Sequence, residues 1–159
     1  MKVDSGLMGD LAQAGASGKR LEAMGYDGAI TAETAHDPFF PLLLAAQETE
    51  RIELITSIAV AFSRTPMNLA NIGHDLNSFS KGRFVLGLGS QIQAHITKRF
   101  SMPWSSPAKR MREFITAMRA IWDSWHKGER LAFEGDYYTH KLMTPMFTPT
   151  DVDYGAPKV

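Results

Sequence analysis

Short apolar runs and helical segments alternate four times along this 159-residue chain. We expect strands at residues 2–5, 26–33, 51–60 and 83–88. Strands that alternate with helices form parallel sheets, in which each connection is a right-handed helical crossover. Apolar strands suit this arrangement, because helices cover both faces of a parallel sheet. Two architectures fit the order: an open doubly wound sheet, or part of a (β/α)8 barrel.

Each expected strand is followed by a segment with helical spacing and a recognisable start. We expect these helices at residues 10–24, 38–46, 66–79 and 107–127. The last three begin at Pro38, Pro66 and Pro107, because proline is tolerated in the first turn of a helix. The first begins at Asp10, a residue type that caps helices. Its expected inward positions are Leu11, Ala14, Leu21 and Met24.

Polar and glycine residues gather where three of the expected strands end. Glu33 and His36 follow the second strand, and Ser57 lies late in the third. The fourth ends in Gly87-Leu88-Gly89-Ser90, where missing side chains allow a sharp turn or a close approach to the backbone. A buried strand that binds nothing would show the same glycines. Ligands bind at the carboxyl ends of parallel strands in both architectures, so this edge is the expected site.

The alternation of strands and helices stops after residue 128. Residues 131–141 are expected to form a small hairpin around Glu134-Gly135-Asp136. A loop with several prolines follows at residues 144–157. Lys158-Val159 then suits the start of another strand.

The composition excludes several classes of function. Lysine plus arginine and aspartate plus glutamate both number 17, so the chain lacks the basic footprint that nucleic-acid binding needs. There is no cysteine, which rules out disulfides and thiolate metal sites, and no histidine pair has the spacing of a metal site. No signal peptide or apolar window of roughly 18 residues is present. We therefore expect a soluble, cytoplasmic protein without a metal, a nucleic-acid partner or a membrane partner.

Five pieces of the chain, taken in order, resemble the N-terminal half of the luciferase-like flavin and deazaflavin oxidoreductases. They are residues 21–28 (Leu-Glu-Ala-Met-Gly-Tyr-Asp-Gly), 33–38 (Glu-Thr-Ala-His-Asp-Pro), 55–60 (Ile-Thr-Ser-Ile-Ala-Val), 64–66 (Arg-Thr-Pro) and 80–89 (Ser-Lys-Gly-Arg-Phe-Val-Leu-Gly-Leu-Gly). Members of this family are TIM barrels, which typically take about 250 residues for eight β/α units. The resemblance implies that residues 1–159 are a single partial TIM-barrel domain, a half barrel. Residues 1–128 would supply four β/α units, and residues 129–159 a hairpin and loop that lead to an absent fifth strand.

The resemblance also implies an activity and a cofactor. The nearest likeness is to enzymes that transfer a hydride between coenzyme F420, a deazaflavin, and an organic small-molecule substrate. The alternatives are an FMN-dependent monooxygenase of the same fold and a catalytically inactive, truncated half barrel. An unrelated nucleotide-binding fold would need Gly-x-Gly-x-x-Gly after the first strand, which Gly6 and Gly9 do not make.

His36 matches a catalytic position of the family, and Glu33 is a second candidate from its place at the end of the same strand. His36 corresponds to a histidine that faces the reactive ring, where an imidazole could exchange a proton with substrate or donate a hydrogen bond to the cofactor. Glu33 is expected to be a second acid or base, or to bind a neighbouring backbone group. Many relatives carry a glutamate acid shortly after the glycine-rich exit, but residues 91–95 read Gln-Ile-Gln-Ala-His. The family's acid is therefore absent there, and His95 is the nearest titratable substitute.

Six further residues are expected to bind the cofactor. The resemblance places a bulge of the third strand at Ser57-Ile58, often with a cis peptide bond, against the cofactor ring. Gly87, Gly89, Ser90 and Gln91 would approach the cofactor through their backbone.

A four-stranded half barrel has two open sheet edges. We therefore expect the isolated chain to be poorly soluble, or to form a homo-oligomer in place of the missing C-terminal half.

Overall fold

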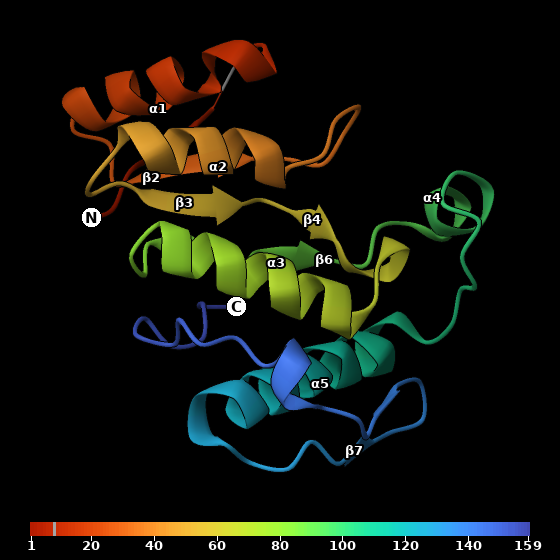
Figure 1. Ribbon diagram of the computed structural model, residues 1–159. Helices are drawn as coiled ribbons and strands as arrows, with labels where there is room; N and C mark the ends of the chain where they lie inside the picture. Colours follow the sequence, from red (N-terminus) through yellow and green to blue (C-terminus); the bar gives the residue numbers. More distant parts are fainter. Residues whose placement is uncertain (8) are drawn as a thin grey trace.

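A parallel four-stranded sheet forms the centre of the computed structural model, which describes residues 1–7 and 9–159 (Figure 1). Its strands, in spatial order, are β1 (Asp4–Gly6), β2 (Gly28–Thr31), β3 (Glu53–Thr56) and β5 (Phe84–Val85). The register pairs Gly6 with Ile30, Ile30 with Ile55, and Ile55 with Val85. One row of residues therefore crosses the sheet, and the predicted parallel α/β order is confirmed.

The third and fourth strands are each interrupted near their carboxyl ends. After the breaks, β4 (Ala59–Val60) pairs in parallel with β6 (Leu88–Gly89). The apolar runs predicted as single strands, 51–60 and 83–88, are thus split. A run of apolar residues shows that a segment is buried, but it does not show where strand pairing is broken.

The four predicted helices are present. They are α1 (Ala14–Ala23, preceded by the 3-10 turn η1, Leu11–Gln13), α2 (Phe39–Glu48), α3 (Pro66–Phe79) and α5 (Pro107–Lys127). A further short helix, α4 (Gln93–Lys98), occupies a segment that the sequence did not predict to be helical. The predicted hairpin consists of β7 (Phe133–Glu134) and β8 (Thr139–His140), and two more 3-10 turns are η2 (Ala61–Ser63) and η3 (Pro145–Phe147).

Two of the predicted inward positions of α1 are wrong. Leu11 is 51% exposed and Met24 is 65% exposed. The residues that α1 buries are small, and Gly18 lies so close to α2 that a Cβ atom there would be 2.8 Å from the Cβ of Ala45. The helix therefore packs through its small residues, because these allow the two backbones to approach closely.

The two faces of the sheet differ in burial. Ala29, Leu54 and Phe84 are almost completely buried on the face that packs against the helices. The opposite face carries the row of Ile30, Ile55 and Val85, whose side chains are only partly buried. In a closed barrel this second face would line the interior. The molecule is therefore half of a barrel with its inner face open.

The end of the chain extends the sheet. Lys158 forms a parallel bridge with Val85, and the amide of Leu86 donates a 2.8 Å hydrogen bond to the carbonyl of Lys158. This isolated bridge lies where the sequence predicted the start of another strand. Within residues 1–7 and 9–159, every helix is too short or too polar to span a membrane.

Candidate functional site

A hollow lies at the carboxyl edge of the sheet, where β1, β2 and β3 end. Its volume is about 360 Å³, and its wall includes Leu7, Ile30, Thr31, His36 and Ser57. The side chains of His36 and Ser57 are exposed there. Two of the predicted site residues, from different β/α units, are thus brought to one hollow.

The loop that carries His36 is held at both ends. Thr31, the last residue of β2, donates a 2.9 Å hydrogen bond from its hydroxyl to the carbonyl of Pro38. On the outer side, Arg99 donates a 2.7 Å hydrogen bond to the carbonyl of Thr34. The segment after β6 therefore lies against the β2–α2 loop, and together they form the rim of the sheet edge.

The interruption of the third strand is the bulge that the resemblance implied. The peptide bond between Ser57 and Ile58 is cis. The amide of Ser57 donates to the carbonyl of Thr31 at 2.6 Å, and the carbonyl of Ile58 accepts from the amide of Glu33 at 3.1 Å. These bonds to the end of β2 fix the bulge, so that Ser57 faces the hollow.

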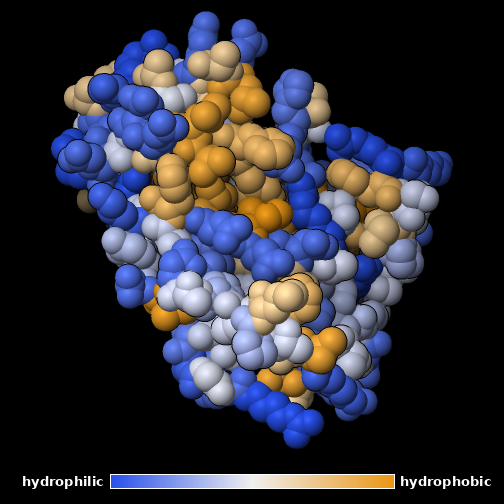
Figure 2. Space-filling model, viewed as in Figure 1, coloured by the Kyte–Doolittle hydropathy of each residue, from blue (hydrophilic) through white to orange (hydrophobic). Residues whose placement is uncertain are grey.

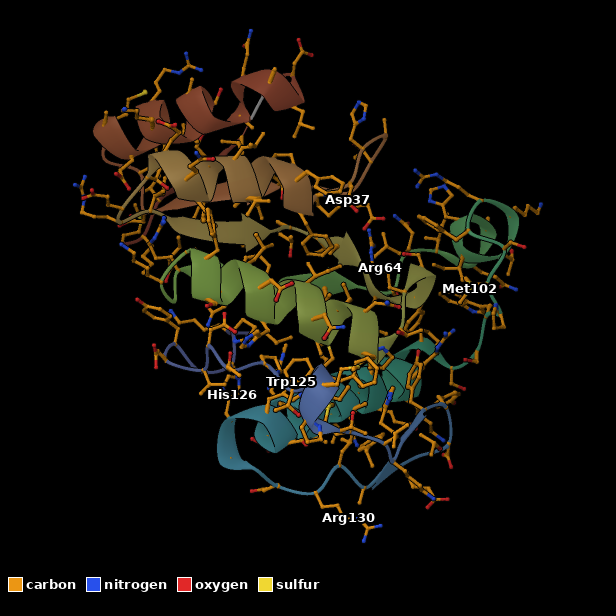
Figure 3. All side chains as sticks on the ribbon, viewed as in Figure 1. Asp37, Arg64, Met102, Trp125, His126 and Arg130 are labelled. Carbon is orange, nitrogen blue, oxygen red and sulfur yellow. The ribbon has the colours of Figure 1, made fainter. Side chains whose placement is uncertain are left out.

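Glu33 does not line the hollow but lies in a buried ion-pair network. Its side chain is 6% exposed, and its Oε2 accepts hydrogen bonds from the amide of Val60 and from Nη1 of Arg64, both at 2.7 Å. Arg64 also donates from Nη2 to Oδ2 of Asp37 at 2.9 Å (Figure 3). Of the two roles expected for Glu33, this geometry matches the contact with a neighbouring backbone group.

Arg64 is the residue of this network that sequence reasoning missed as a functional position. Its guanidinium joins the carboxylates of Glu33 and Asp37 and lies 5.3 Å from the ring centroid of Phe39. Glu33 and Asp37 flank His36 in the sequence, so Arg64 fixes both ends of the segment that carries the histidine. The only sequence feature that pointed to Arg64 was its place in the Arg-Thr-Pro stretch, which resembles the family.

The glycines of the fourth strand have partners within the chain. A Cβ atom on Gly87 would lie 1.9 Å from the carbonyl oxygen of Thr56, and one on Gly89 would lie 2.7 Å from Cδ1 of Ile58. Thr56 also donates a 2.9 Å hydrogen bond to the carbonyl of Gly87. The close backbone approach that the sequence predicted is therefore made by the neighbouring strand.

Ser90 and Gln91 follow these glycines at the same edge but outside the wall of the hollow. Both are partly buried, and the hydroxyl of Ser90 donates to the carbonyl of Gln91 at 3.1 Å. Gln91 has a positive φ of 61° and turns the chain towards α4. His95, the nearest substitute for the absent glutamate, is exposed on α4 and also lies outside the hollow.

Three comparisons place the chain among known proteins. The family model described as luciferase-like monooxygenase matches residues 2–159. An uncharacterized protein of Mycobacterium tuberculosis is 58% identical over 159 residues, which are 100% of this chain and 47% of that protein. An F420-dependent glucose-6-phosphate dehydrogenase of Intrasporangium calvum is 32% identical over 138 residues, which cover 76% of this chain and 40% of that protein.

The fold is also that of solved structures. The oxygenating constituent of 3,6-diketocamphane monooxygenase from Pseudomonas putida, solved in complex with FMN, superposes with a TM-score of 0.78 at 18% identity, over 99% of this chain and 50% of that one. The chain thus spans about half the length of the proteins it matches. At this identity the likeness concerns the fold.

Proposed function

Because the chain belongs to the luciferase-like monooxygenase family, we propose that it forms the N-terminal half of an oxidoreductase site that transfers a hydride between coenzyme F420 and an organic substrate. The juxtaposition of His36 and Ser57 in one hollow at the carboxyl edge supports this proposal most strongly. The 32% identity with a relative named as F420-dependent favours the deazaflavin over FMN.

The wall of the hollow fits the planar ring of such a cofactor. It offers the apolar side chains of Leu7 and Ile30 together with an exposed histidine, and its volume of about 360 Å³ is within the usual range for ligand pockets. No lysine or arginine belongs to this wall among the residues that the structure describes. We therefore assign only the ring to this hollow and place the phosphate tail of the cofactor elsewhere.

The residues of the chain have separate roles in this proposal. A bound deazaflavin supplies or accepts the hydride. His36, exposed at the rim, donates or accepts the proton that accompanies the change at the substrate. Ser57 supports the ring from the bulge of the third strand. Glu33 and Arg64 are positioning residues, since they hold the loop of His36 and do not reach the hollow.

Titration of the purified chain with F420, and separately with FMN, tests the proposal through cofactor fluorescence. We expect saturable binding of F420 that is tighter than binding of FMN. Ser57→Leu should weaken the binding of both, because a larger side chain fills the hollow. His95→Asn is the matched control, since it changes an exposed histidine outside the hollow.

The outcomes separate the competing functions. Tighter binding of FMN than of F420 would favour an FMN-dependent monooxygenase of the same fold. Absence of binding by either cofactor, with a folded chain by circular dichroism, would favour an inactive half barrel. Binding that His95→Asn weakens as much as Ser57→Leu would place the ring outside this hollow.

A further inference from the structure

The segment that follows β6 is basic. Between Gly89 and Glu113 the chain contains neither aspartate nor glutamate. Its lysines and arginines there are Lys98, Arg99, Lys109, Arg110 and Arg112. Figure 2 shows hydrophilic side chains over α4, at the upper right of the view. Because β6 ends at the carboxyl edge of the sheet, this segment brings positive charge to the edge where the hollow of His36 lies.

Three of these five cations are engaged away from the hollow. Arg110 is only 6% exposed, and its side chain donates hydrogen bonds within the protein. Lys109 and Arg112 line a separate hollow between α5 and the β7–β8 hairpin. Lys98 and Arg99 remain, and both are exposed where α4 ends.

Arg99 reaches the loop that carries His36. Its Nη2 donates a 2.7 Å hydrogen bond to the carbonyl of Thr34, a residue that lines the same hollow as His36. Two residues of chain span at most about 7 Å, so the guanidinium lies at the rim of the hollow close to the histidine. The ring centroid of Phe100 lies 4.7 Å from Cζ of Arg99 and supports the guanidinium. A positive charge is therefore fixed beside the candidate proton-transfer residue.

The charge of Arg99 is not neutralised within the part of the chain that the structure describes. The two carboxylates of the nearby loop, Glu33 and Asp37, are bound to Arg64 instead, at 2.7 and 2.9 Å. The contact with Thr34 uses one hydrogen of Nη2, which leaves its second hydrogen and those of Nε and Nη1. A guanidinium with such donors binds a carboxylate or a phosphate through two parallel hydrogen bonds.

We propose that Arg99 binds an anionic group of the substrate, a carboxylate or a phosphate, while the reacting carbon of the substrate lies beside His36. This inference rests on the function proposed for the hollow. The wall of the hollow contains no lysine or arginine among the described residues, so the anion is held at the rim while the cofactor ring occupies the hollow. The substrate is therefore an organic acid or a phosphate ester.

The position of Arg99 favours the substrate over the phosphate tail of the cofactor. Arg99 contacts the loop of His36, and His36 exchanges its proton with the substrate in the proposed reaction. An anion held by Arg99 and a carbon served by His36 thus lie on one molecule.

NMR spectroscopy of the full chain tests this site with benzoate as the probe, because benzoate joins an apolar ring to a single carboxylate. His36→Gln identifies the imidazole signals of His36. We expect benzoate to shift these signals saturably, and Arg99→Gln to raise its Kd about fivefold, the size expected for an exposed ion pair. Glutamine keeps an N–H donor for the carbonyl of Thr34, so the loop retains its contact.

Lys98→Gln is the matched control, since it removes an equal charge from the neighbouring exposed residue. It should change the Kd of benzoate less than twofold. Benzamide, the neutral isostere, should bind about fivefold more weakly than benzoate and should not respond to Arg99→Gln. Phenyl phosphate replaces benzoate in a second arm, and the anion that depends more strongly on Arg99 gives the class of substrate.

Three outcomes would overturn the proposal. Arg99→Gln and Lys98→Gln would weaken the binding of both anions equally, or neither anion would shift the signals of His36. The third concerns FMN and riboflavin, which share a ring and differ by one phosphate. We expect Arg99→Gln to leave the binding of both unchanged, whereas a selective loss of FMN would assign Arg99 to the cofactor phosphate.

The same titrations separate this proposal from the function on which it rests. Failure of F420 and FMN to bind, with benzoate still bound through Arg99 and sensed by His36, would overturn the oxidoreductase function and uphold the anion site. Binding of F420 with no response of benzoate to Arg99→Gln would do the reverse.

Discussion

The Glu33 carboxylate and the Arg64 guanidinium lie 2.7 Å apart, and they join the end of β2 to the segment after β4. Their side chains are 6% and 17% exposed, so the pair is largely withdrawn from water. Because Arg64 also binds Asp37, one cation holds both carboxylates that flank His36. The position of the candidate proton-transfer residue therefore depends on an arginine in the following β/α unit.

Arg64→Ala should destabilise the fold strongly. It leaves the buried Glu33 carboxylate without its cation, and such a loss typically costs about 3 kcal/mol or more. Urea denaturation followed by circular dichroism measures the free energy of unfolding. Lys127→Ala removes an exposed pair with Asp123 and should change that free energy little. Equal effects of the two substitutions would show that the Glu33–Arg64 pair contributes no more than a surface pair.

Gly87→Ala should be among the most damaging small substitutions. Its Cβ atom would lie 1.9 Å from the carbonyl oxygen of Thr56, which is backbone and cannot move away alone. We expect a loss of about 3 kcal/mol or more in the free energy of unfolding, from strain between the two strands. Gly155→Ala serves as the comparison, since that position has open space but a φ of 66°. Its cost should be only about 1 kcal/mol, and a larger loss there than at Gly87 would contradict the packing argument.

Mild acid should destabilise the contact between α3 and α5. Partial burial lowers the pKa of the His126 imidazole, and the neighbouring His74, whose ring centroid is 5.5 Å away, lowers it further. The unfolded chain therefore binds this proton more readily than the folded one does. The stabilising contribution is complete above pH 6.5 and is lost as the pH falls through 6.5 towards the lower pKa of the folded state.

Thermal unfolding across this pH range tests the role of His126, which lies at the end of α5 next to Trp125 (Figure 3). His126→Gln should reduce the fall in Tm below pH 6.5. His95→Gln, which changes an exposed histidine, should leave the fall unchanged. The same fall in all three proteins would show that another group is responsible.

A second loss of stability is expected at lower pH, from Glu22. Burial alone would raise the pKa of this carboxyl, but hydrogen bonds from the amides of Ile52, Arg51 and Glu50 outweigh it and lower the pKa. The stability from this lowered pKa is present above about pH 4.5 and disappears as the pH falls through the folded-state value. Glu22→Gln should make unfolding less dependent on pH below 4.5. An unchanged slope would assign the acid transition to other carboxylates.

The order of strands and helices was predictable because it depends on local patterns. The boundaries of α3 follow from Pro66 and from apolar residues at helical spacing up to Phe79, and the structure confirms them. The inward face of α1 was not predictable in the same way. Large apolar residues usually face inward, but α1 meets α2 through Gly18 and other small residues. The short α4 was not predicted from the sequence, because six residues contain too few helical turns to show a periodic spacing of apolar residues.

The candidate site was predictable only where a residue acts alone. His36 and Ser57 follow strand ends, and parallel topology brings such positions to one edge. The Glu33–Arg64 pair joins residues 31 positions apart, and no local pattern shows that one will neutralise the other. The glycines at 87 and 89 did indicate close approach, but a glycine does not reveal what approaches it. Here the neighbouring strand does so.

The bridge between Lys158 and Val85 affects how such sheets can assemble. An open sheet polymerises without limit only if strands can be added at both of its edges. The β5 edge is already engaged by the chain's own Lys158, through the bond from Leu86. A strand of another molecule could therefore pair with Val85 and Leu86 only by displacing Lys158. Among the described residues, β1 is the edge strand of this sheet that has a neighbour on one side alone.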